Sequence, residues 1–266
     1  MKAFISIDME GICGIVREIE TDPVKGGGAY QQSRHLMTQE ANAAIEGCMK
    51  AGATEILIAD SHWNFDNLIP EELHEAAILL RGTPRGFSMV EELDASSDAA
   101  LFVGYHARAG TPRAILDHTY SGTVAAVRVN GMEVGETGIN AALCGQWECP
   151  VLLVTGDDAV CREATELLGE GLTTVSVKKG LGRFSARQVP PLRAREMIED
   201  GARRALQDLS AVKPYDPGRP CEIRIEFTTP DRLVEYRNRR GTEQVDDHTL
   251  VSKADDWWTA WSQFYF

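Results

Sequence analysis

The sequence predicts an α/β fold in which a largely parallel, helix-covered sheet is followed by a smaller C-terminal lobe or appendage. The first observation is that apolar runs of strand length alternate with helix-like segments over most of the 266 residues. Such alternation is typical of βαβ units, which build parallel sheets. The second is a change in composition after about residue 185, where a Pro- and Gly-rich connector and an aromatic tail appear. We therefore expect an α/β core at residues 1–185 and a smaller α+β part at 186–266, which serves packing or an oligomer interface.

The elements of the core can be assigned in chain order from their apolar periodicity. Strands are expected at 2–8, 54–60, 76–82, 98–106 and 150–156, and a hairpin at 123–136 turns at Asn130-Gly131. Helices are expected at 33–52, 137–148 and 157–169; the first ends at Gly52, and Asp157 or Asp158 caps the last. In the smaller part, a helix at 188–209 and a strand at 221–227 flank the connector KPYDPGRP.

Polar side chains gather where the expected strands end. Asp8 and Glu10 follow the first strand, His62 the second and His106 the fourth, while Glu136 ends the hairpin. In open parallel sheets, functional groups collect at the carboxyl ends of the strands. Asp8 and Glu10 lie two residues apart, so in extended chain both side chains leave the same face. Two such carboxylates repel each other unless a cation or a proton lies between them.

These five side chains form a set of nitrogen and oxygen ligands suited to zinc, manganese or cobalt. The set contains no cysteine, which argues against a closed structural zinc site. One divalent ion would leave the three carboxylates with excess negative charge, whereas two ions with a bridging hydroxide would balance them. The sequence therefore favours a two-metal hydrolase, in which the ions activate a water molecule. A plainer alternative stays open, because no compact motif such as HExxH is present: each residue could be an isolated surface acid or loop histidine.

Other patterns are given structural roles. The glycine-rich stretch KGGGAY (25–30) lacks the GK[ST] ending of a phosphate-binding loop and is expected to be a flexible loop. No GxGxxG follows the first strand, and no GxSxG surrounds Ser61. The aromatic residues of the tail are expected in the core or in a subunit interface. They are Trp257, Trp258, Trp261, Phe264 and Tyr265.

Composition restricts the partners and the compartment. The formal net charge of -13 argues against nucleic acid and anionic membranes, which both need clustered Lys and Arg. No apolar run approaches the roughly 20 residues of a membrane helix, and acids appear too early for a signal-peptide core. The six cysteines form no CxxC pair and are expected to be buried, reduced thiols. We therefore expect a cytoplasmic protein.

Five stretches in chain order resemble the D-aminopeptidase family of bacterial zinc peptidases, of the dipeptide-permease operon type. They are SIDMEGICG, ADSHWNFDNL, FVGYHARAGTP, LDHT and VGETGINAAL, and the resemblance weakens after about residue 180. It implies that Asp8 bridges two zinc ions. Glu10 and His62 would then complete one site, and His106 and Glu136 the other. The resemblance also implies a homo-oligomer, a ring-shaped decamer that encloses its active sites.

The stretch LDHT contributes Asp117 and His118. The resemblance implies that His118 is the catalytic histidine, and near a dizinc centre a histidine can shuttle a proton or donate to a developing oxyanion. Asp117 departs from the family, where a serine usually precedes this histidine. A carboxylate there could raise the pKa of His118, or it could point away into solvent. Asp117 and Asn67, which lies within ADSHWNFDNL, are taken as supporting residues.

We therefore expect a dizinc aminopeptidase that hydrolyses short peptides, with an N-terminal D-amino acid such as D-Ala preferred by family precedent. The metals would polarise the scissile carbonyl and lower the pKa of a bound water towards about 7. The free amine of the substrate would need a carboxylate such as Glu10 or Asp117, or a metal, nearby. Two alternatives stay open: a metal-dependent hydrolase of another small amide or ester, and a non-catalytic metal-binding protein.

Overall fold

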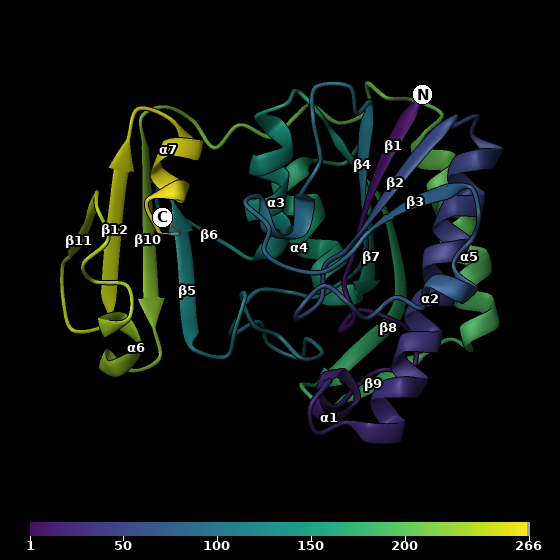
Figure 1. Cartoon of the computed structure of the whole chain (residues 1–266), viewed down its shortest axis with the longest axis horizontal. Helices are drawn as coiled ribbons and strands as arrows, with labels where there is room; N and C mark the ends of the chain where they lie inside the picture. Colours follow the sequence, from purple (N-terminus) through teal and green to yellow (C-terminus); the bar gives the residue numbers. More distant parts are fainter. Residues whose placement is uncertain (265–266) are drawn as a thin grey trace.

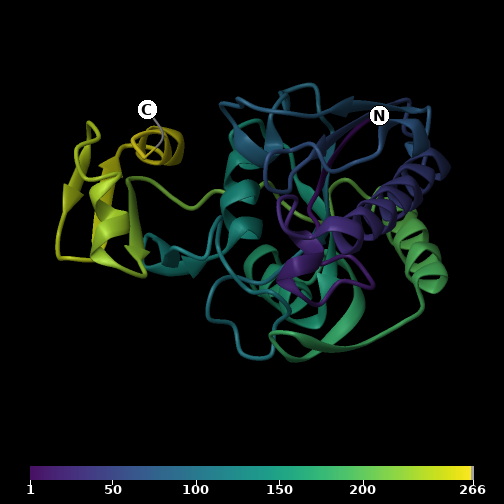
Figure 2. The same cartoon turned by 60° about the horizontal axis from the view of Figure 1, so that its bottom comes forward.

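The computed structural model describes residues 1–264, which form two sheets (Figure 1). Seven strands form the larger sheet, in the order β3-β2-β1-β4-β7-β8-β9, and five form the smaller, in the order β11-β12-β10-β5-β6, within these residues. Figure 2 shows the smaller sheet beside the larger one; its later strands are yellow and yellow-green, and its β5-β6 hairpin is teal. The predicted α/β fold class is confirmed by the largely parallel larger sheet and the separate smaller lobe.

The larger sheet supplies the platform of the molecule. Its strands are β1 (Lys2–Ile7), β2 (Glu55–Asp60), β3 (Ala77–Leu80), β4 (Ala99–Tyr105), β7 (Val151–Asp157), β8 (Thr173–Gly182) and β9 (Ser185–Gln188). Neighbouring strands are parallel except for β8 and β9. Strands β4 and β7 are buried along their whole length, since their apolar residues are covered on both faces.

Helices cover both faces of this sheet (Figure 1). Helices α2 (Gly27–Lys50) and α5 (Pro191–Ala205) pack against each other on one face, and α3 (Glu136–Gly145) and α4 (Asp158–Leu168) lie on the other. Asp157 is the N-cap of α4, because its side chain accepts hydrogen bonds from the amides of Ala159 and Val160. Among residues 1–264, no helix is both long enough and apolar enough to cross a membrane.

The smaller sheet is antiparallel throughout. It consists of β5 (Val124–Val129), β6 (Met132–Val134), β10 (Cys221–Phe227), β11 (Thr242–Gln244) and β12 (Thr249–Ala254). Helix α7 (Trp257–Ser262) packs against β10 and β12, and the side chains of Trp257, Trp261 and Phe264 are buried. Trp258 is partly buried, and Tyr265 lies outside the described residues. The short helices α1 (Glu18–Thr21), α6 (Pro230–Val234), η1 (Pro70–Glu72) and η2 (Ser88–Val90) lie in loops.

The two sheets use interleaved parts of the chain. The β5-β6 hairpin, which lies within residues 1–185, hydrogen-bonds to β10 in the smaller sheet. Helix α5, which lies within residues 186–266, packs against α2 on the larger sheet. Strand pairing therefore does not follow the boundary expected at residue 185, and that division into domains stays a prediction.

Local predictions were largely confirmed, with one clear error. The hairpin turns at Asn130 and Gly131, whose φ angles of 49° and 83° are those of the expected tight turn. All six cysteines are buried and free, as predicted. The expectation of a flexible loop at residues 25–30 is wrong, because α2 begins at Gly27 with Gly26 as its N-cap. The first turn of α2 contains Tyr30, which is buried and donates a hydrogen bond of 2.7 Å to Asn67, and this contact fixes the turn despite the weak helix propensity of glycine.

Candidate metal centre

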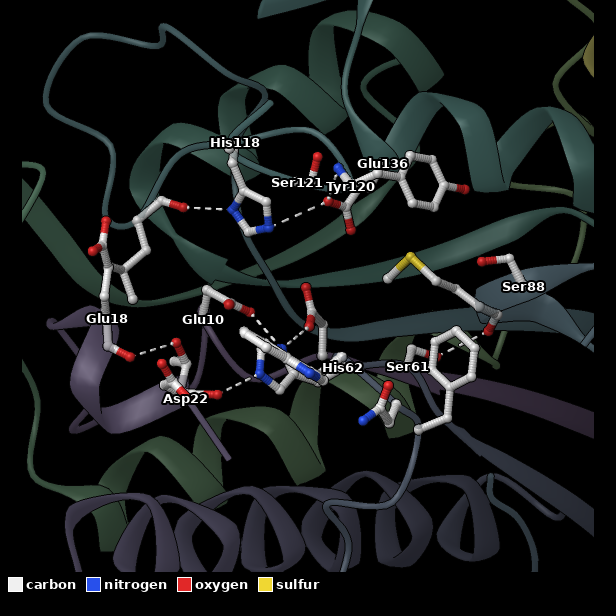
Figure 3. A pocket seen from close by; sticks show the side chains of 18 of the residues that line it. Glu10, Glu18, Asp22, Ser61, His62, Ser88, His118, Tyr120, Ser121 and Glu136 are labelled. Carbon is white, nitrogen blue, oxygen red and sulfur yellow. Dashed lines mark hydrogen bonds and ion pairs between the residues drawn. The ribbon is translucent and has the colours of Figure 1, made fainter. Parts of the chain in front are cut away.

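The site lies at the carboxyl ends of three neighbouring strands. Strand β1 lies between β2 and β4, with Ile7 paired to Asp60 on one side and to Val103 on the other. The residues that follow these strands therefore converge, which brings Asp8 and Glu10 beside His62 and His106. Glu136 joins them from the first residue of α3. Figure 3 shows His118 and Glu136 on one side of the pocket and Glu10 and His62 on the other.

Asp8 occupies the centre of this cluster. Its Oδ1 lies 3.2 Å from His62 Nδ1, and its Oδ2 lies 3.4 Å from His106 Nε2. Glu10 Oε2 is 3.1 Å from the same nitrogen of His62. On the other side, Glu136 Oε1 is 3.2 Å from His106 Nε2. One carboxylate thus faces two carboxylate–histidine pairs.

Each of the three histidines has one ring nitrogen beside a backbone carbonyl. His62 Nε2 lies 2.8 Å from the Thr21 oxygen, His106 Nδ1 3.0 Å from that of Ala107, and His118 Nδ1 2.8 Å from that of Leu116. Because a carbonyl can only accept, the ring nitrogen beside it must carry the hydrogen. The other nitrogen of each ring faces the carboxylates, and in the neutral ring it offers a lone pair, as in histidines that bind metals.

The cluster is deeply buried and has unsatisfied atoms. Asp8 and His106 are each 2% exposed, and Glu10 is 5% exposed. Within residues 1–264, Asp8 Oδ2, Glu10 Oε2 and His106 Nε2 have no hydrogen-bond partner. Buried polar atoms normally have one, so three orphans in a single cluster call for an explanation. Bound divalent cations would give these atoms partners, and the residues present therefore fit a metal site.

The pKa values of Asp8, His62 and His106 also indicate a site that binds positive charge. Burial and the neighbouring Glu10 raise the pKa of Asp8 to about 7. Burial alone would lower the pKa of His62, but the carboxylates of Glu10 and Asp8 raise it well above its ordinary value. The same holds for His106, whose pKa is raised by Glu136 against the effect of burial. The cluster therefore binds positive charge strongly, in the form of protons or of metal cations.

His118 lies against the cluster and faces the cavity. Its ring stacks on that of His106 with 4.0 Å between centroids, and its Nε2 lies 3.7 Å from Glu136 Oε1. Potential ligand atoms of His106, His118 and Glu136 lie within 4.8 Å of one another, as do those of Asp8, Glu10 and His106. Geometry alone therefore allows His118 to be a ligand as well as a catalytic group.

Neither expectation for Asp117 is correct. Its Oδ1 accepts a hydrogen bond of 2.7 Å from Arg183, and its Oδ2 accepts one of 2.7 Å from the amide of Gly110. The carboxylate is thus neither in open solvent nor directed at the neighbouring imidazole. The pKa of His118 is lowered, not raised, because burial and the nearby His106 outweigh Glu136 and Glu10.

Asn67 supports the site from behind. Its side-chain amide donates to Asp60 Oδ1 at 2.8 Å and to the His62 carbonyl at 2.6 Å, while its oxygen accepts from Tyr30. Asn67 is fully buried and does not line the cavity. These hydrogen bonds link the loop that carries His62 to Asp60 at the end of β2.

A cavity of about 570 Å³ opens in front of the cluster. Loop residues that sequence reasoning did not single out form much of its wall: Glu18, Asp22, Trp63, Phe65, Met89, Tyr120, Ser121 and Arg183. The amide of Tyr120 donates a 2.7 Å hydrogen bond to Glu136 Oε1 and so orients this carboxylate. Trp63 and Phe65 belong to the stretch ADSHWNFDNL, but nothing local in the sequence marks these residues as cavity wall, and only the folded loops bring them together.

A buried, cation-binding cluster of carboxylates and histidines at the strand ends of an α/β sheet, open to a cavity of substrate size, defines a metal-dependent hydrolase. Comparison with known families makes the class specific. The chain belongs to the peptidase M55 family of D-aminopeptidases, whose profile matches residues 1–266. The predicted resemblance to this family is therefore confirmed.

Two relatives are similar to the chain over nearly its whole length. It is 40% identical to a D-aminopeptidase of Bacillus subtilis (strain 168) over 251 residues, which are 94% of this chain and 90% of that protein. Its fold matches the solved structure of the Zn-dependent D-aminopeptidase DppA from Bacillus subtilis, described as a self-compartmentalizing protease. The TM-score is 0.94 at 36% identity, with 99% of this chain and 95% of that chain covered.

Proposed function

We propose that this protein is a zinc-dependent aminopeptidase that removes an N-terminal D-amino acid, such as D-Ala, from short peptides. The observation that carries the proposal is the buried cluster around Asp8, with three unpartnered ligand atoms, in a chain of the D-aminopeptidase family. A sequence of this family could have lost activity, but here the carboxylates and histidines are all present and converge.

Two zinc positions account for the cluster. Asp8 would bridge them, with Glu10 and His62 completing one and His106 and Glu136 the other; manganese or cobalt would suit the same ligands. When bound, the ions supply a Lewis acid and a water molecule of lowered pKa. The backbone carbonyls beside the two histidines hold each ring in the orientation that directs its lone pair to the metal.

His118 would move the proton. Its Nδ1 donates to the Leu116 carbonyl, so in the neutral ring Nε2 is an acceptor that faces Glu136 and the cavity. The lowered pKa favours this neutral ring at pH 7. His118 would take a proton from the attacking water at Nε2 and return it to the leaving amine.

The substrate would lie in the cavity with its amine near the metal centre. Of the two carboxylates expected to bind this amine, Asp117 is engaged by Arg183 and Gly110, which leaves Glu10 beside the metals. Trp63 and Phe65 offer apolar walls for the substrate side chains. A cavity of about 570 Å³ suits a short peptide better than a folded protein.

We also propose that the chain forms a homo-oligomer, with a ring of ten subunits as the specific expectation, and that it acts in the cytoplasm. The solved relative is described as self-compartmentalizing, which requires several copies to enclose a space. Light scattering on the purified protein would then give a mass about ten times the 29.2 kDa of the chain.

A dipeptide panel tests the activity. The zinc-loaded protein should cleave D-Ala-D-Ala and leave L-Ala-L-Ala intact; EDTA should abolish the activity, and zinc or manganese should restore it. Equal cleavage of both peptides would refute the D preference. Hydrolysis of simple esters or amides without peptide cleavage would favour a different hydrolase. No hydrolysis by protein that carries its full metal content would mean a metal-binding protein without catalysis.

A further inference from the structure

Lys178 is a buried cation that the proposed mechanism does not use. It lies on β8 and is 2% exposed. Its ammonium donates to the backbone oxygens of Glu10 at 2.6 Å, Ile12 at 2.8 Å and Ile15 at 2.6 Å. An ammonium has three hydrogens, and all three are used here. Lys178 therefore has no lone pair to act as a nucleophile or a base, and its role must be sought in the loop it contacts.

That loop, residues 9–15, leaves β1 and carries Glu10. It forms neither helix nor strand, and Met9, Ile12, Cys13 and Ile15 are fully buried. Buried backbone carbonyls outside regular structure need donors from elsewhere. One lysine side chain meets this need for three carbonyls at once, including that of Glu10, the proposed zinc ligand.

The buried side chain of Glu40 contacts the same loop, at one of the loop's backbone amides. Glu40, on α2, is 2% exposed, and its Oε1 accepts a 2.8 Å hydrogen bond from the amide of Cys13. The loop is thus fixed by an ammonium from β8 at its carbonyls and by a carboxylate from α2 at an amide. Strand β8 belongs to the larger sheet, and α2 packs on it. The loop is therefore held to this part of the molecule both through its carbonyl oxygens and through an amide.

We propose that Lys178, assisted by Glu40, is a positioning residue of the metal centre, which holds loop 9–15 so that the Glu10 carboxylate reaches the zinc it shares with His62. This inference rests on the proposed function. Electrostatics alone would argue against a lysine here, because a buried ammonium repels the metal cations it adjoins. Positioning and repulsion therefore predict opposite effects when the charge is removed.

The test replaces Lys178 by methionine, which keeps the length and apolar stem of the side chain but has no donors. Zinc affinity of each site is measured by competition with a chromophoric chelator, and the absorption spectrum of the cobalt-substituted protein reports the geometry. Positioning predicts that one of the two zinc sites weakens about 10- to 100-fold, as for other residues that orient a ligand. Lys179→Met, at the exposed neighbouring position on β8, is the matched control and should bind as wild type.

Glu40→Leu keeps the proposal testable if Lys178→Met fails to fold. It removes the acceptor for the Cys13 amide and should weaken the same zinc site, while Glu40→Gln keeps an oxygen there and should restore binding. Unchanged or tighter zinc binding in Lys178→Met and Glu40→Leu would overturn the proposal, as would equal weakening of both sites. If wild-type protein itself binds no zinc, the proposed function fails, and this outcome is distinct from failure of the positioning role.

Discussion

The two sheets of this protein differ in the burial and pairing of their charged side chains. At the carboxyl edge of the larger sheet, Asp8, Glu10 and His106 are buried with ligand atoms that have no hydrogen-bond partner. In the smaller sheet, charged side chains lie at the surface in pairs: Arg128 contacts Glu226 at 3.1 Å, and Glu222 contacts Lys253 at 2.9 Å. Such pairing is typical of residues that serve structure alone.

The interior of the smaller sheet also lacks the buried ionisable cluster that is found at the edge of the larger sheet, among the described residues. It is apolar, with Trp257 and Trp261 stacked at 5.3 Å between ring centroids. Among the described residues of this sheet and its helices, the only buried side-chain atom without a hydrogen-bond partner is the neutral Nε1 of Trp257. Among the described residues, the unpartnered atoms of buried ionisable groups all belong to the larger sheet, its helices and the loops at its edge, and those of Asp8, Glu10 and His106 gather in one cluster. The smaller sheet instead combines paired surface charges with an apolar core, and the clustering of unpartnered atoms therefore marks the functional region.

The largest expected effect is the loss of function at the centre of the first region. Asp8→Ala should bind neither zinc ion and should hydrolyse D-Ala-D-Ala no faster than background, because both proposed metal positions would share this carboxylate. The metal-free variant should unfold no more easily than metal-free wild type, since a repelling carboxylate has gone. Metal analysis and urea unfolding measure the two effects, with the exposed Asp94→Ala as control. Two zinc ions in Asp8→Ala would remove the bridging role.

In the smaller sheet, a substitution is expected to lower stability and leave the zinc content unchanged. Trp257→Ala removes a fully buried indole and should lower the free energy of unfolding by about 3–5 kcal/mol. The zinc content of the folded variant should not change. Trp258→Ala, at the partly buried neighbouring position, should cost less. Loss of zinc from folded Trp257→Ala would show that the smaller sheet takes part in the metal centre, and the comparison would fail.

His118 tests the boundary between binding and catalysis within the first region. His118→Ala should lower turnover at least about 10²-fold, the low end for a positioned proton-transfer group, while both zinc ions are retained. Steady-state kinetics and metal analysis of the same sample decide the matter. A variant that has lost zinc would identify His118 as a ligand, which its position near His106 and Glu136 also permits.

Two glutamates, Glu40 beside the larger sheet and Glu222 in the smaller one, should make the stability respond to pH with opposite signs. Burial raises the pKa of Glu40 to about 7 from an ordinary value of 4.5, so the folded state holds this proton more tightly than the unfolded state. Glu40 therefore contributes stability at low pH that is lost as pH rises from about 4.5 to 7, by at most about 1.4 kcal/mol per pH unit. Urea unfolding of Glu40→Gln across this range should lack that slope.

Glu222 is the matched case in the smaller sheet. Hydrogen bonds from Arg224 and Lys253 lower its pKa, so its contribution is present above the ordinary pKa and is lost as pH falls. Because the Glu222 side chain is partly exposed and solvent weakens its ion pairs, Glu222→Gln should remove only a small slope of this sign. If both substitutions changed the pH slope of the free energy of unfolding in the same direction, the contrast between the two glutamates would be contradicted.

The smallest effect is expected at Asp117. Its ion pair with Arg183 is partly exposed, so Asp117→Asn should change the activity by no more than about 1 kcal/mol, or roughly fivefold. Kinetics on D-Ala-D-Ala measure this change. A loss as large as that of His118→Ala would assign Asp117 a direct role in catalysis.

The sequence predicted the parallel sheet and the gathering of its polar strand ends because both follow from local pattern. Parallel strands end at the same edge, so residues such as Asp8, His62 and His106 had to converge once the strands were assigned. Their roles as ligands stay proposals. The position of Glu136 followed from the hairpin, whose return strand leads directly into α3.

The other features depend on contacts between distant parts of the chain. Lys178 occurs in VSVKKG beside an exposed lysine, and nothing local separates the two. The pairing of β5 with β10 joins segments on either side of α3, α4 and α5, so the sheet to which the hairpin belongs could not be assigned. The partner of Asp117 is Arg183, on the turn between β8 and β9, and a sequence does not reveal such pairs.

The central claim is that a shared Asp8 holds two metal ions in one buried cluster. Stepwise zinc addition to EDTA-treated protein, followed by both zinc content and D-Ala-D-Ala hydrolysis, tests it most directly. We predict two zinc ions per chain in wild type, full activity only when both are present, and none bound in Asp8→Ala. Full activity with a single zinc ion, or with no bound metal, would contradict the account.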